Sequence, residues 1–340
     1  MKEFQHGGDI KSFAKKANCK EKEAIDLSSN INFLKPILDI DFNSLEISSY
    51  PNYDKLYRAI SKHYNVMKSQ IELYNGGSSV IFKLFENLKL KHCTIYSPAY
   101  LEYKKAAQNF DYKIDLINRF ENIKKEVKKG SFVIFVNPST PDAKCYNIKK
   151  LLNYWIKKEC TILIDESFLE FTNHESATKY IKEYDKLYIL KSMTKFYSSA
   201  GIRVGTIISS KENIKRLKEK EPMWKISTFD MTYLIEVLKY KNFYEKTKAK
   251  NKENKKHLIS TLKKYSFIKK IYKSEANYLL VELKDIKAKE LQEELIPYKI
   301  MIRDCSNFDF LGKHHVRIAV KSKKSIKLLE KAFKEIEKCI

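Results

Sequence analysis

A lysine among hydroxyl-bearing and aromatic side chains is the residue best placed for covalent chemistry. Lys195 lies in the segment Ser192-Met193-Thr194-Lys195-Phe196-Tyr197, and Arg203 follows it closely. An amine in such surroundings can form a Schiff base with an aldehyde cofactor. Ser192 and Arg203 could then bind an anion such as a phosphate. The alternative is a surface lysine, which is common in a chain with 66 Lys and Arg residues.

Three further motifs carry groups that suit a flat, phosphorylated cofactor. Asn75-Gly76-Gly77-Ser78-Ser79 precedes a helical stretch over residues 80–88, so its backbone N–H groups could bind a phosphate. Tyr100 in Pro98-Ala99-Tyr100 could stack on a heteroaromatic ring, and Asp165 could keep a pyridine nitrogen protonated. Each motif also has a simpler structural explanation: a capped helix, a core tyrosine or a helix cap.

A proline-rich turn and two arginines complete the candidate set. The turn Asn137-Pro138-Ser139-Thr140-Pro141 is stiff, and its polar side chains could reach a phenolate oxygen of a cofactor. Arg303 and Arg317 stand at strand-like positions in a chain where lysine dominates. Their planar donor groups suit carboxylates and phosphates, although a structural ion pair would explain each of them.

Short apolar runs that alternate with amphipathic stretches must position these side chains. The runs cover residues 93–96, 132–136, 161–164, 186–190 and 205–208, and residues 148–158 have helical spacing. The nearly continuous apolarity predicts strands covered on both faces, and the alternation predicts a three-layer α/β domain over residues 50–230. Polar motifs that follow such strands can converge, because ligand sites lie at the carboxyl ends of the strands.

The rest of the chain predicts a smaller domain and an arm. Residues 232–264 read as one long helical region, residues 276–283 and 316–320 as strands, and residues 322–338 as an amphipathic helix. We expect residues 231–340 to hold the linking helix and a small α+β domain. The N-terminal arm, residues 1–49, is expected to pack on this domain or on a partner subunit.

The composition favours an enzyme with an anionic substrate. The net charge is +24 over 340 residues, but the lysines are spread along the chain, which argues against a specific nucleic-acid partner. No run of eighteen apolar residues exists and the N-terminus lacks an apolar targeting segment, so we expect a cytoplasmic protein without a membrane partner. The six cysteines form no CxxC pair or zinc-type spacing, which predicts free, buried or semi-buried thiols and no metal site.

In chain order, these motifs resemble the fold-type I enzymes that use pyridoxal 5′-phosphate (PLP), in the aminotransferase class I/II superfamily. The resemblance implies a three-layer αβα fold with a large mixed-sheet domain, a smaller C-terminal domain and a homodimer with shared active sites. It implies that Lys195 bonds covalently to PLP, that Asp165 pairs with the ring nitrogen and that Tyr100 stacks on the ring. The positions implied to hold the cofactor phosphate are Gly77, Ser78, Ser192, Arg203 and, from the neighbouring subunit, Tyr50 in Ser49-Tyr50-Pro51. Those implied to bind the substrate are His6, Asn30, Arg303 and Arg317.

Two branches of the superfamily compete, the threonine-phosphate decarboxylases and the histidinol-phosphate aminotransferases. The segments that look more like the first are His6-Gly7-Gly8-Asp9, Leu27-Ser28-Ser29-Asn30-Ile31-Asn32, Asp165-Glu166-Ser167-Phe168 and Ile302-Arg303-Asp304-Cys305-Ser306-Asn307-Phe308. The leading interpretation is decarboxylation of L-threonine O-3-phosphate or L-serine phosphate. The alternatives are transamination of histidinol phosphate or a similar phosphorylated amine, and a basic, noncatalytic nucleic-acid-binding protein.

The chain departs from the family pattern around the phenolate oxygen. Thr140 stands where the family turn has its second asparagine, and Asp142-Ala143 replace Thr-Gly. Phe168 stands where the aminotransferases usually have a tyrosine that reaches the cofactor. Thr140 can still donate one hydrogen bond, so we expect a sparser contact to this oxygen and no change of cofactor.

Overall fold

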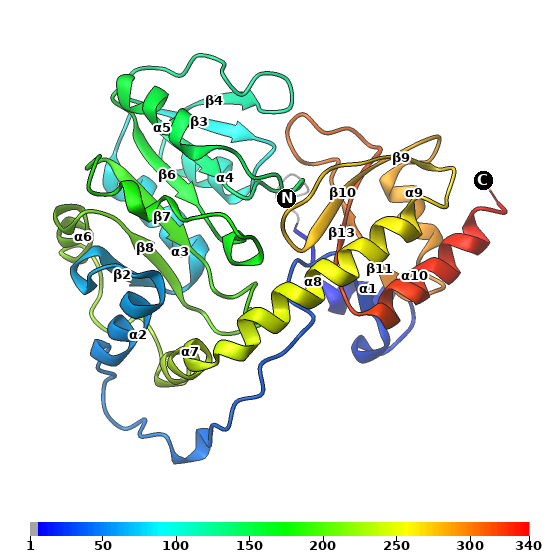
Figure 1. The fold of residues 1–340 in the computed structure, drawn as a ribbon, viewed down its shortest axis with the longest axis horizontal. Coiled ribbons are helices and arrows are strands. Elements are labelled where there is room, and N and C mark those ends of the chain that lie inside the picture. Colours follow the sequence, from blue (N-terminus) through cyan, green and yellow to red (C-terminus); the bar gives the residue numbers. More distant parts are fainter. Residues whose placement is uncertain (1–5, 340) are drawn as a thin grey trace.

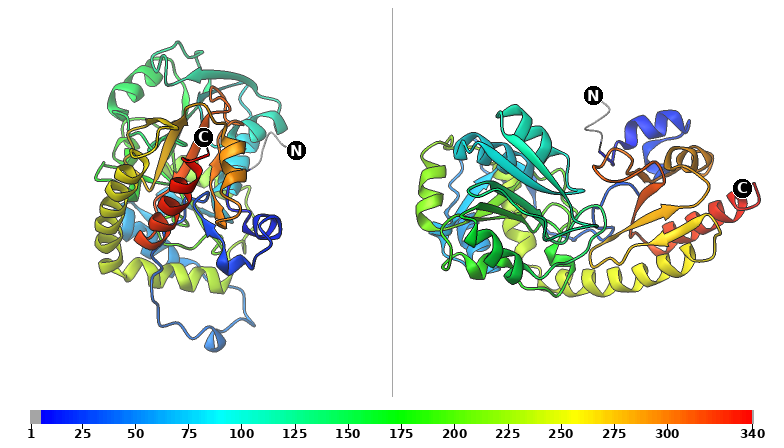
Figure 2. Two further views of the ribbon diagram at one scale, coloured as in Figure 1. Left: turned by 90° about the vertical axis from the view of Figure 1, so that its right-hand side faces the viewer. Right: turned by 90° about the horizontal axis from the view of Figure 1, so that it is seen from above.

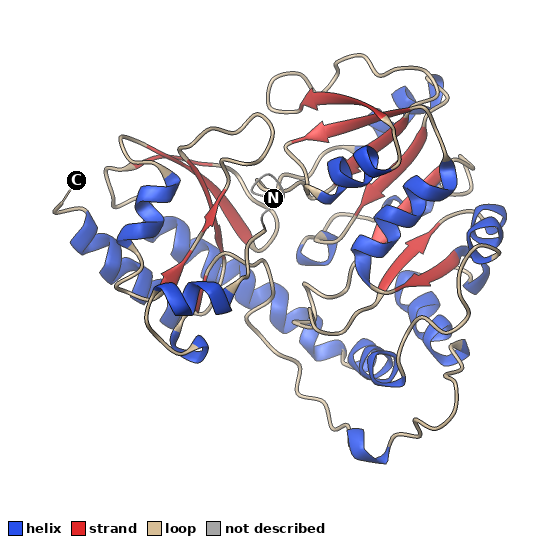
Figure 3. Cartoon of the chain, turned by 180° about the vertical axis from the view of Figure 1, so that it is seen from behind, coloured by secondary structure: helices blue, strands red, loops and turns tan. Residues whose placement is uncertain are grey.

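The computed structural model describes residues 6–339, which form two bodies built on separate β-sheets. Figure 1 shows helix α8 (Lys241–Leu262) running diagonally from the body around the larger sheet to the body around the smaller one. The view from above in Figure 2 shows the same helix spanning both bodies, and Figure 3 shows the two groups of strands apart. A single long helix therefore connects the two parts.

The larger sheet has seven strands in the order β2-β8-β7-β6-β5-β3-β4. Their bounds are β2 (Ile71–Tyr74), β8 (Gly205–Ile208), β7 (Leu187–Lys191), β6 (Thr161–Asp165), β5 (Phe132–Val136), β3 (His92–Ser97) and β4 (Lys113–Asn118). β8 runs antiparallel to both of its neighbours, while the pairs from β7 to β4 are parallel. The sheet is therefore mixed, as expected.

Alternate side chains of the central strands pack on opposite helical layers. Phe132 and Ile134 face the core formed with α3 (Gly76–Leu88), α4 (Glu102–Asn109) and α6 (Lys211–Lys218). Val133 and Phe135 face the other core, which contains Trp155 of α5 (Ile148–Lys157). Since residues i and i+2 of a strand point to one face, an apolar run such as residues 132–136 needs helices on both sides. The predicted three-layer arrangement is confirmed.

The smaller sheet is antiparallel and is covered by helices on one face. Its strands, in spatial order, are β12 (Arg303–Asp304), β13 (His315–Ala319), β10 (Tyr278–Leu283) and β9 (Ile268–Ile271). Its core includes side chains of α8, α9 (Ala288–Glu294) and α10 (Lys323–Ile336). On the opposite face, Leu280 packs with Leu101 and so faces the larger body.

The part of the N-terminal arm from α1 (Ile10–Lys16) to β1 (Ile25–Asp26) joins the smaller body, whereas Leu34 and Leu38 further along the arm pack on the larger body. Strand β1 pairs in parallel with β11 (Ile300–Met301). The backbone of Leu27 continues this contact, since its N–H donates to the Met301 carbonyl. The predicted boundaries between the arm and the two domains, at residues 49/50 and 230/231, stay a prediction.

Two expectations about secondary structure and thiols were wrong in detail. The helical region over residues 232–264 divides at Tyr240 into α7 (Thr228–Lys239) and α8, because Tyr240 has a non-helical ψ of 72° where the chain leaves the larger body. Cys339 is exposed, since it follows the last turn of α10, while the other free cysteines are buried or half-buried. No helix within residues 6–339 is long and apolar enough to span a membrane.

Candidate active site

The predicted site residues meet in one cavity of about 320 Å³ between the two bodies. The cavity lies between the carboxyl ends of β5, β6 and β7 and the strands β12 and β13 of the smaller sheet. The predicted residues that line it are His6, Asn30, Gly77, Ser78, Tyr100, Thr140, Asp165, Ser192, Lys195, Arg203, Arg303 and Arg317. Tyr50 is the predicted residue that does not line it.

Lys195 is partly buried in the loop that follows β7. Its Nζ donates a hydrogen bond of 2.9 Å to Ser192 Oγ, which in turn lies 3.0 Å from Thr194 Oγ1. Burial lowers the pKa of Lys195; the Asp165 carboxylate opposes this effect and Arg203 adds to it. A lowered pKa increases the fraction of neutral amine, which is the nucleophilic form.

Asp165, the last residue of β6, is held by groups that the sequence did not indicate. Tyr103 Oη donates to Asp165 Oδ2 over 2.6 Å, and the Ser167 backbone N–H donates to Oδ1 over 2.8 Å. Tyr103 lies in the first turn of α4, three residues after Tyr100, and that short spacing is the signal that could have pointed to it. The carboxylate is therefore buried and fixed in one orientation.

An anion-binding corner forms where α3 begins beside β8. The helix starts at Gly76, earlier than expected, and within residues 6–339 the preceding Asn75 makes no capping hydrogen bond. Gly76 has φ +82°, and a Cβ there would collide with the Arg203 guanidinium. A Cβ on Gly205 would lie 2.6 Å from the Gly76 carbonyl oxygen. The absence of side chains at both positions lets Arg203 approach the N-terminus of α3, where N–H groups and the helix dipole favour a phosphate.

Arg303 and Arg317 are neighbours on adjacent strands, since they are Cα partners in the β12–β13 pair. Both are buried, and burial lowers the pKa of each guanidinium. Arg317 donates to the Ser28 carbonyl over 3.0 Å and to Thr140 Oγ1 over 3.3 Å. Among residues 6–339, Arg317 Nε and Asn30 Oδ1 are buried without a hydrogen-bond partner. A bound anion would offset the cost of burying the two guanidinium groups, whereas the Asn30 oxygen needs a donor.

Asp142, one of the departures from the family turn, forms a buried ion pair that the sequence did not predict. Arg119 Nη2 lies 2.7 Å from Asp142 Oδ1, and their side chains are 1% and 2% exposed. Arg119 also donates to the Thr140 carbonyl over 2.8 Å and to the Pro98 carbonyl. This pair therefore ties the turn that carries Thr140 to the loop that carries Tyr100.

His6 and Tyr50, the outermost predicted residues, differ in their relation to the cavity. The ring of His6 lies 5.1 Å from that of Tyr100, and its Nε2 lies 2.9 Å from Glu102 Oε1. Tyr50 is 74% exposed and stacks on Trp224, with 4.0 Å between ring centroids. Its predicted role in the site of a neighbouring subunit stays a prediction.

A family model described as aminotransferase class I and II matches residues 25–336. The chain belongs to this family. The cofactor of the family is PLP, so the protein is a PLP-dependent class I/II enzyme. The resemblance drawn from the ordered motifs, and the fold that it implied, are confirmed.

The relatives include enzymes of both branches. The chain is 28% identical to the adenosylcobalamin biosynthesis bifunctional protein CobDQ of Leptospira interrogans, over 98% of this chain and 41% of that protein, so it spans less than half of that relative. It is 28% identical to a putative threonine-phosphate decarboxylase of Caldanaerobacter subterraneus, over 94% of this chain and 90% of that protein. The solved histidinol-phosphate aminotransferase of Clostridium acetobutylicum is 31% identical, with a TM-score of 0.80 over 86% of this chain and 92% of that chain.

Proposed function

We propose that this enzyme decarboxylates an O-phosphorylated amino acid, L-threonine O-3-phosphate or L-serine phosphate, to the corresponding amino-alcohol phosphate. The observation that carries the proposal is the convergence of the four segments that resemble the decarboxylase branch. Each contributes to the wall of the same cavity, through His6 and Gly7, through Ser29, Asn30 and Ile31, through Ser167 and Phe168, and through Arg303 and Phe308. The branch-specific positions thus surround the space that a substrate would enter.

The larger body is proposed to hold the cofactor. Lys195 would bond to it covalently, Asp165 would pair with its ring nitrogen, Tyr100 would stack on its ring and Thr140 would donate to its phenolate oxygen. The corner made by Gly77, Ser78, Ser192 and Arg203 would bind its phosphate. When bound, PLP withdraws the electron pair left at Cα by a broken bond. The uncapped start of α3, the low pKa of Lys195 and the fixed Asp165 carboxylate support this assignment.

The smaller body and the arm are proposed to bind the substrate. A phosphorylated amino acid has two anionic ends, and the adjacent Arg303 and Arg317 supply two buried guanidinium groups. Asn30 and His6 would complete the set. The Asn30 side-chain oxygen, which has no partner in the described chain, would accept a hydrogen bond from the substrate amine. These groups would orient the substrate, and the orientation selects the bond at Cα that breaks.

A homodimer with shared sites is part of the proposal. Tyr50, Met223 and Trp224 are 74%, 72% and 51% exposed, which is unusual for large apolar side chains that lie together. A partner subunit that covers them would bring Tyr50 towards a second cavity. Light scattering on the purified protein should give twice the chain mass, and fractionation should place it in the cytoplasm.

The rival activity is transamination of histidinol phosphate or a similar phosphorylated amine, and the 31% identity to a solved aminotransferase favours it. The two activities separate in one assay. The PLP-loaded enzyme is incubated with phosphothreonine, phosphoserine or histidinol phosphate, with and without 2-oxoglutarate, and carbon dioxide and phosphorylated products are measured. Release of carbon dioxide and phosphorylated amine without 2-oxoglutarate supports decarboxylation. A strict requirement for 2-oxoglutarate would refute it and establish the aminotransferase.

A further inference from the structure

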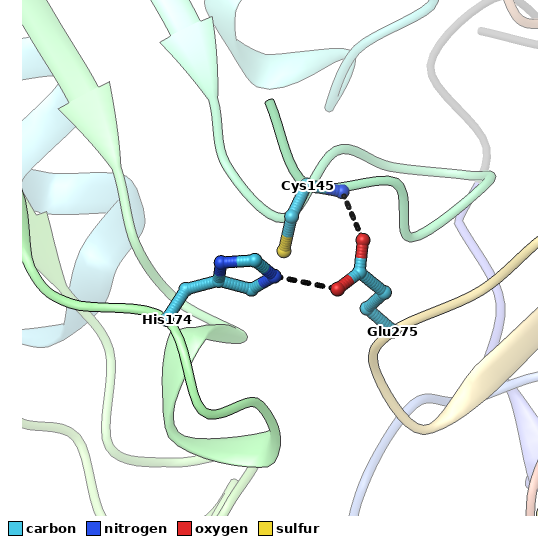
Figure 4. A group of neighbouring side chains, drawn as sticks. All are labelled: Cys145, His174 and Glu275. Atoms are coloured by element: carbon cyan, nitrogen blue, oxygen red, sulfur yellow. Dashed lines mark hydrogen bonds and ion pairs between the residues drawn. The ribbon is translucent and has the colours of Figure 1, made fainter. Parts of the chain in front are cut away.

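A second cluster of side chains capable of chemistry lies at the junction of the two bodies, outside the cavity described above. Cys145, His174 and Glu275 each offer one ligand atom, and these atoms all lie within 4.8 Å of one another. Figure 4 shows the three side chains directed towards a common point from three different loops. None of the three lines the active-site cavity.

The loops that carry the cluster come from both bodies. Cys145 follows the turn after β5, and His174 follows a short helical turn after β6, so both belong to the larger body. Glu275 precedes β10 of the smaller body. The Glu275 backbone N–H donates to the Ala143 carbonyl over 2.9 Å, which holds the two loops together at the main chain. The ligand atoms are therefore brought together by the fold itself.

Hydrogen bonds also hold the His174 and Glu275 side chains and the backbone of Cys145. Glu275 Oε2 lies 2.5 Å from His174 Nε2, and Glu275 Oε1 accepts from the Cys145 backbone N–H over 3.3 Å. Lys255 Nζ donates to the carbonyls of Ser274 and Ala276, over 3.1 and 2.9 Å, and so fixes the residues on both sides of Glu275. Such outer contacts are what orient the ligands of protein metal sites.

We propose that Cys145, His174 and Glu275 bind a divalent cation of the zinc class, which links the two bodies. Thiolate, imidazole and carboxylate are the ligands that Zn²⁺ takes in proteins, often three of them with water in the fourth position. A thiolate excludes Mg²⁺ and Ca²⁺ as preferred occupants, because these cations select oxygen ligands. The inference does not rest on the proposed decarboxylase activity.

The charges and protons of the bound state balance. On binding, the Cys145 thiol would release one proton to solvent, and the proton that His174 Nε2 donates to Glu275 would move through solvent to Nδ1. The imidazole then stays neutral, and the hydrogen bond gives way to two metal–ligand bonds. One thiolate, one carboxylate and one neutral imidazole then carry a total charge that cancels the two positive charges of the cation. A site without net charge suits a partly buried position, because burial penalises charge.

The cluster is open to a cation and to the water that would complete its coordination. Surface cavities reach it from two sides, one lined by Cys145 and His174 and the other by Cys145 and Glu275. The His174 side chain is 50% exposed. A cation can therefore enter without unfolding, and its bonds to both bodies would restrain their relative movement.

The test uses the tag-free, PLP-loaded enzyme after treatment with a chelator. Titration with Co²⁺ should give one equivalent of binding with a thiolate-to-cobalt charge-transfer band, and Zn²⁺ should displace the Co²⁺. Cys145→Ser should abolish the band, and His174→Gln and Glu275→Gln should each weaken binding at least about tenfold. Cys339→Ser, which removes an exposed thiol at the far end of the chain, is the matched control and should bind as the wild type does.

PLP absorbance of each variant reports whether it has folded, and Glu275→Gln keeps the shape of the side chain if Cys145→Ser is unstable. Binding to the wild type should also raise the temperature of unfolding, and this rise should disappear in Glu275→Gln. Absence of the charge-transfer band in the wild type, or a band of equal strength in Cys145→Ser, would overturn the proposal.

Discussion

The two halves of the active-site cavity differ in how their polar groups are satisfied. On the side of the larger sheet, Asp165 and Lys195 already have hydrogen-bond partners within their own body. On the side of the smaller sheet and the arm, Arg317 Nε and Asn30 Oδ1 are buried without partners in the described chain. The first half holds its reactive side chains in place and leaves the uncapped start of α3 open to an anion, which suits a resident phosphorylated cofactor. The second half keeps buried side-chain atoms without partners, which suits a molecule that comes and goes. Substitutions on either side of the cavity, and in the turn between the two bodies, test this division.

Lys195→Ala should remove the covalent link to the cofactor and lower turnover by roughly 10³-fold or more. Activity is measured as phosphorylated amine released, and the link as the adduct that borohydride reduces. A variant that kept full turnover and a reducible adduct would refute the assignment of Lys195.

Asp142→Ala should destabilise the protein by about 3–5 kcal/mol, because it leaves the buried Arg119 charge unpaired. The loss is measured by urea denaturation. The turn that holds Asp142 also contacts the smaller body, since Tyr278 Oη donates to the Ser139 carbonyl over 2.8 Å. Replacing both partners, as in Arg119→Met with Asp142→Leu, should recover much of the stability; a double variant as unstable as the single one would contradict the account.

Arg317→Lys should lower kcat/KM by about 10²-fold while the PLP absorbance stays unchanged, because lysine lacks the planar donor fork of arginine. Arg58→Lys is the control, since Arg58 is 71% exposed on α2 (Asp54–Tyr64). Loss of bound PLP from Arg317→Lys would mean that the two halves are not separate in function.

Tyr103→Phe should reduce kcat by roughly tenfold, the effect of removing one hydrogen bond to a buried charged group. The affinity for substrate should change little, because Tyr103 contacts Asp165 on the cofactor side. A rise in KM with an unchanged kcat would instead indicate a contact with the substrate.

The stability of the apoprotein should depend on pH through the lowered pKa of Lys195. Burial lowers the pKa of Lys195 in the folded protein below the value of 10.5 expected in the unfolded chain. Between these two pKa values the unfolded chain binds one more proton than the folded protein, so the free energy of unfolding rises with pH. At neutral pH the Lys195→Met apoprotein should therefore have a higher free energy of unfolding than the wild-type apoprotein. Urea denaturation at several pH values should show this difference shrinking as the pH approaches 10.5. A difference that grows with pH would show that the folded state favours the charged amine.

Much of the fold, and the grouping of polar residues on the larger-sheet side of the cavity, follows from local patterns. Apolar runs such as residues 132–136 and 205–208 coincide with β5 and β8, because a strand covered on both faces must be apolar throughout. The edge strand β4 was not predicted. Most of its side chains are exposed or only partly buried, so they form no continuous apolar run in the sequence. The break at Tyr240 also escaped prediction, because it reflects packing on two bodies and no glycine or proline marks it.

The order of the motifs along the chain was enough to identify the family and its cofactor. Only the folded structure shows which residues that lie far apart in the sequence are in contact. The partners of Asp165 and Asp142, the pairing of Arg303 with Arg317 and the Cys145, His174 and Glu275 cluster are all of this kind. The physical reason is that local composition sets the periodicity of each element, whereas these contacts depend on how loops of separate elements meet when both sheets and α8 have packed.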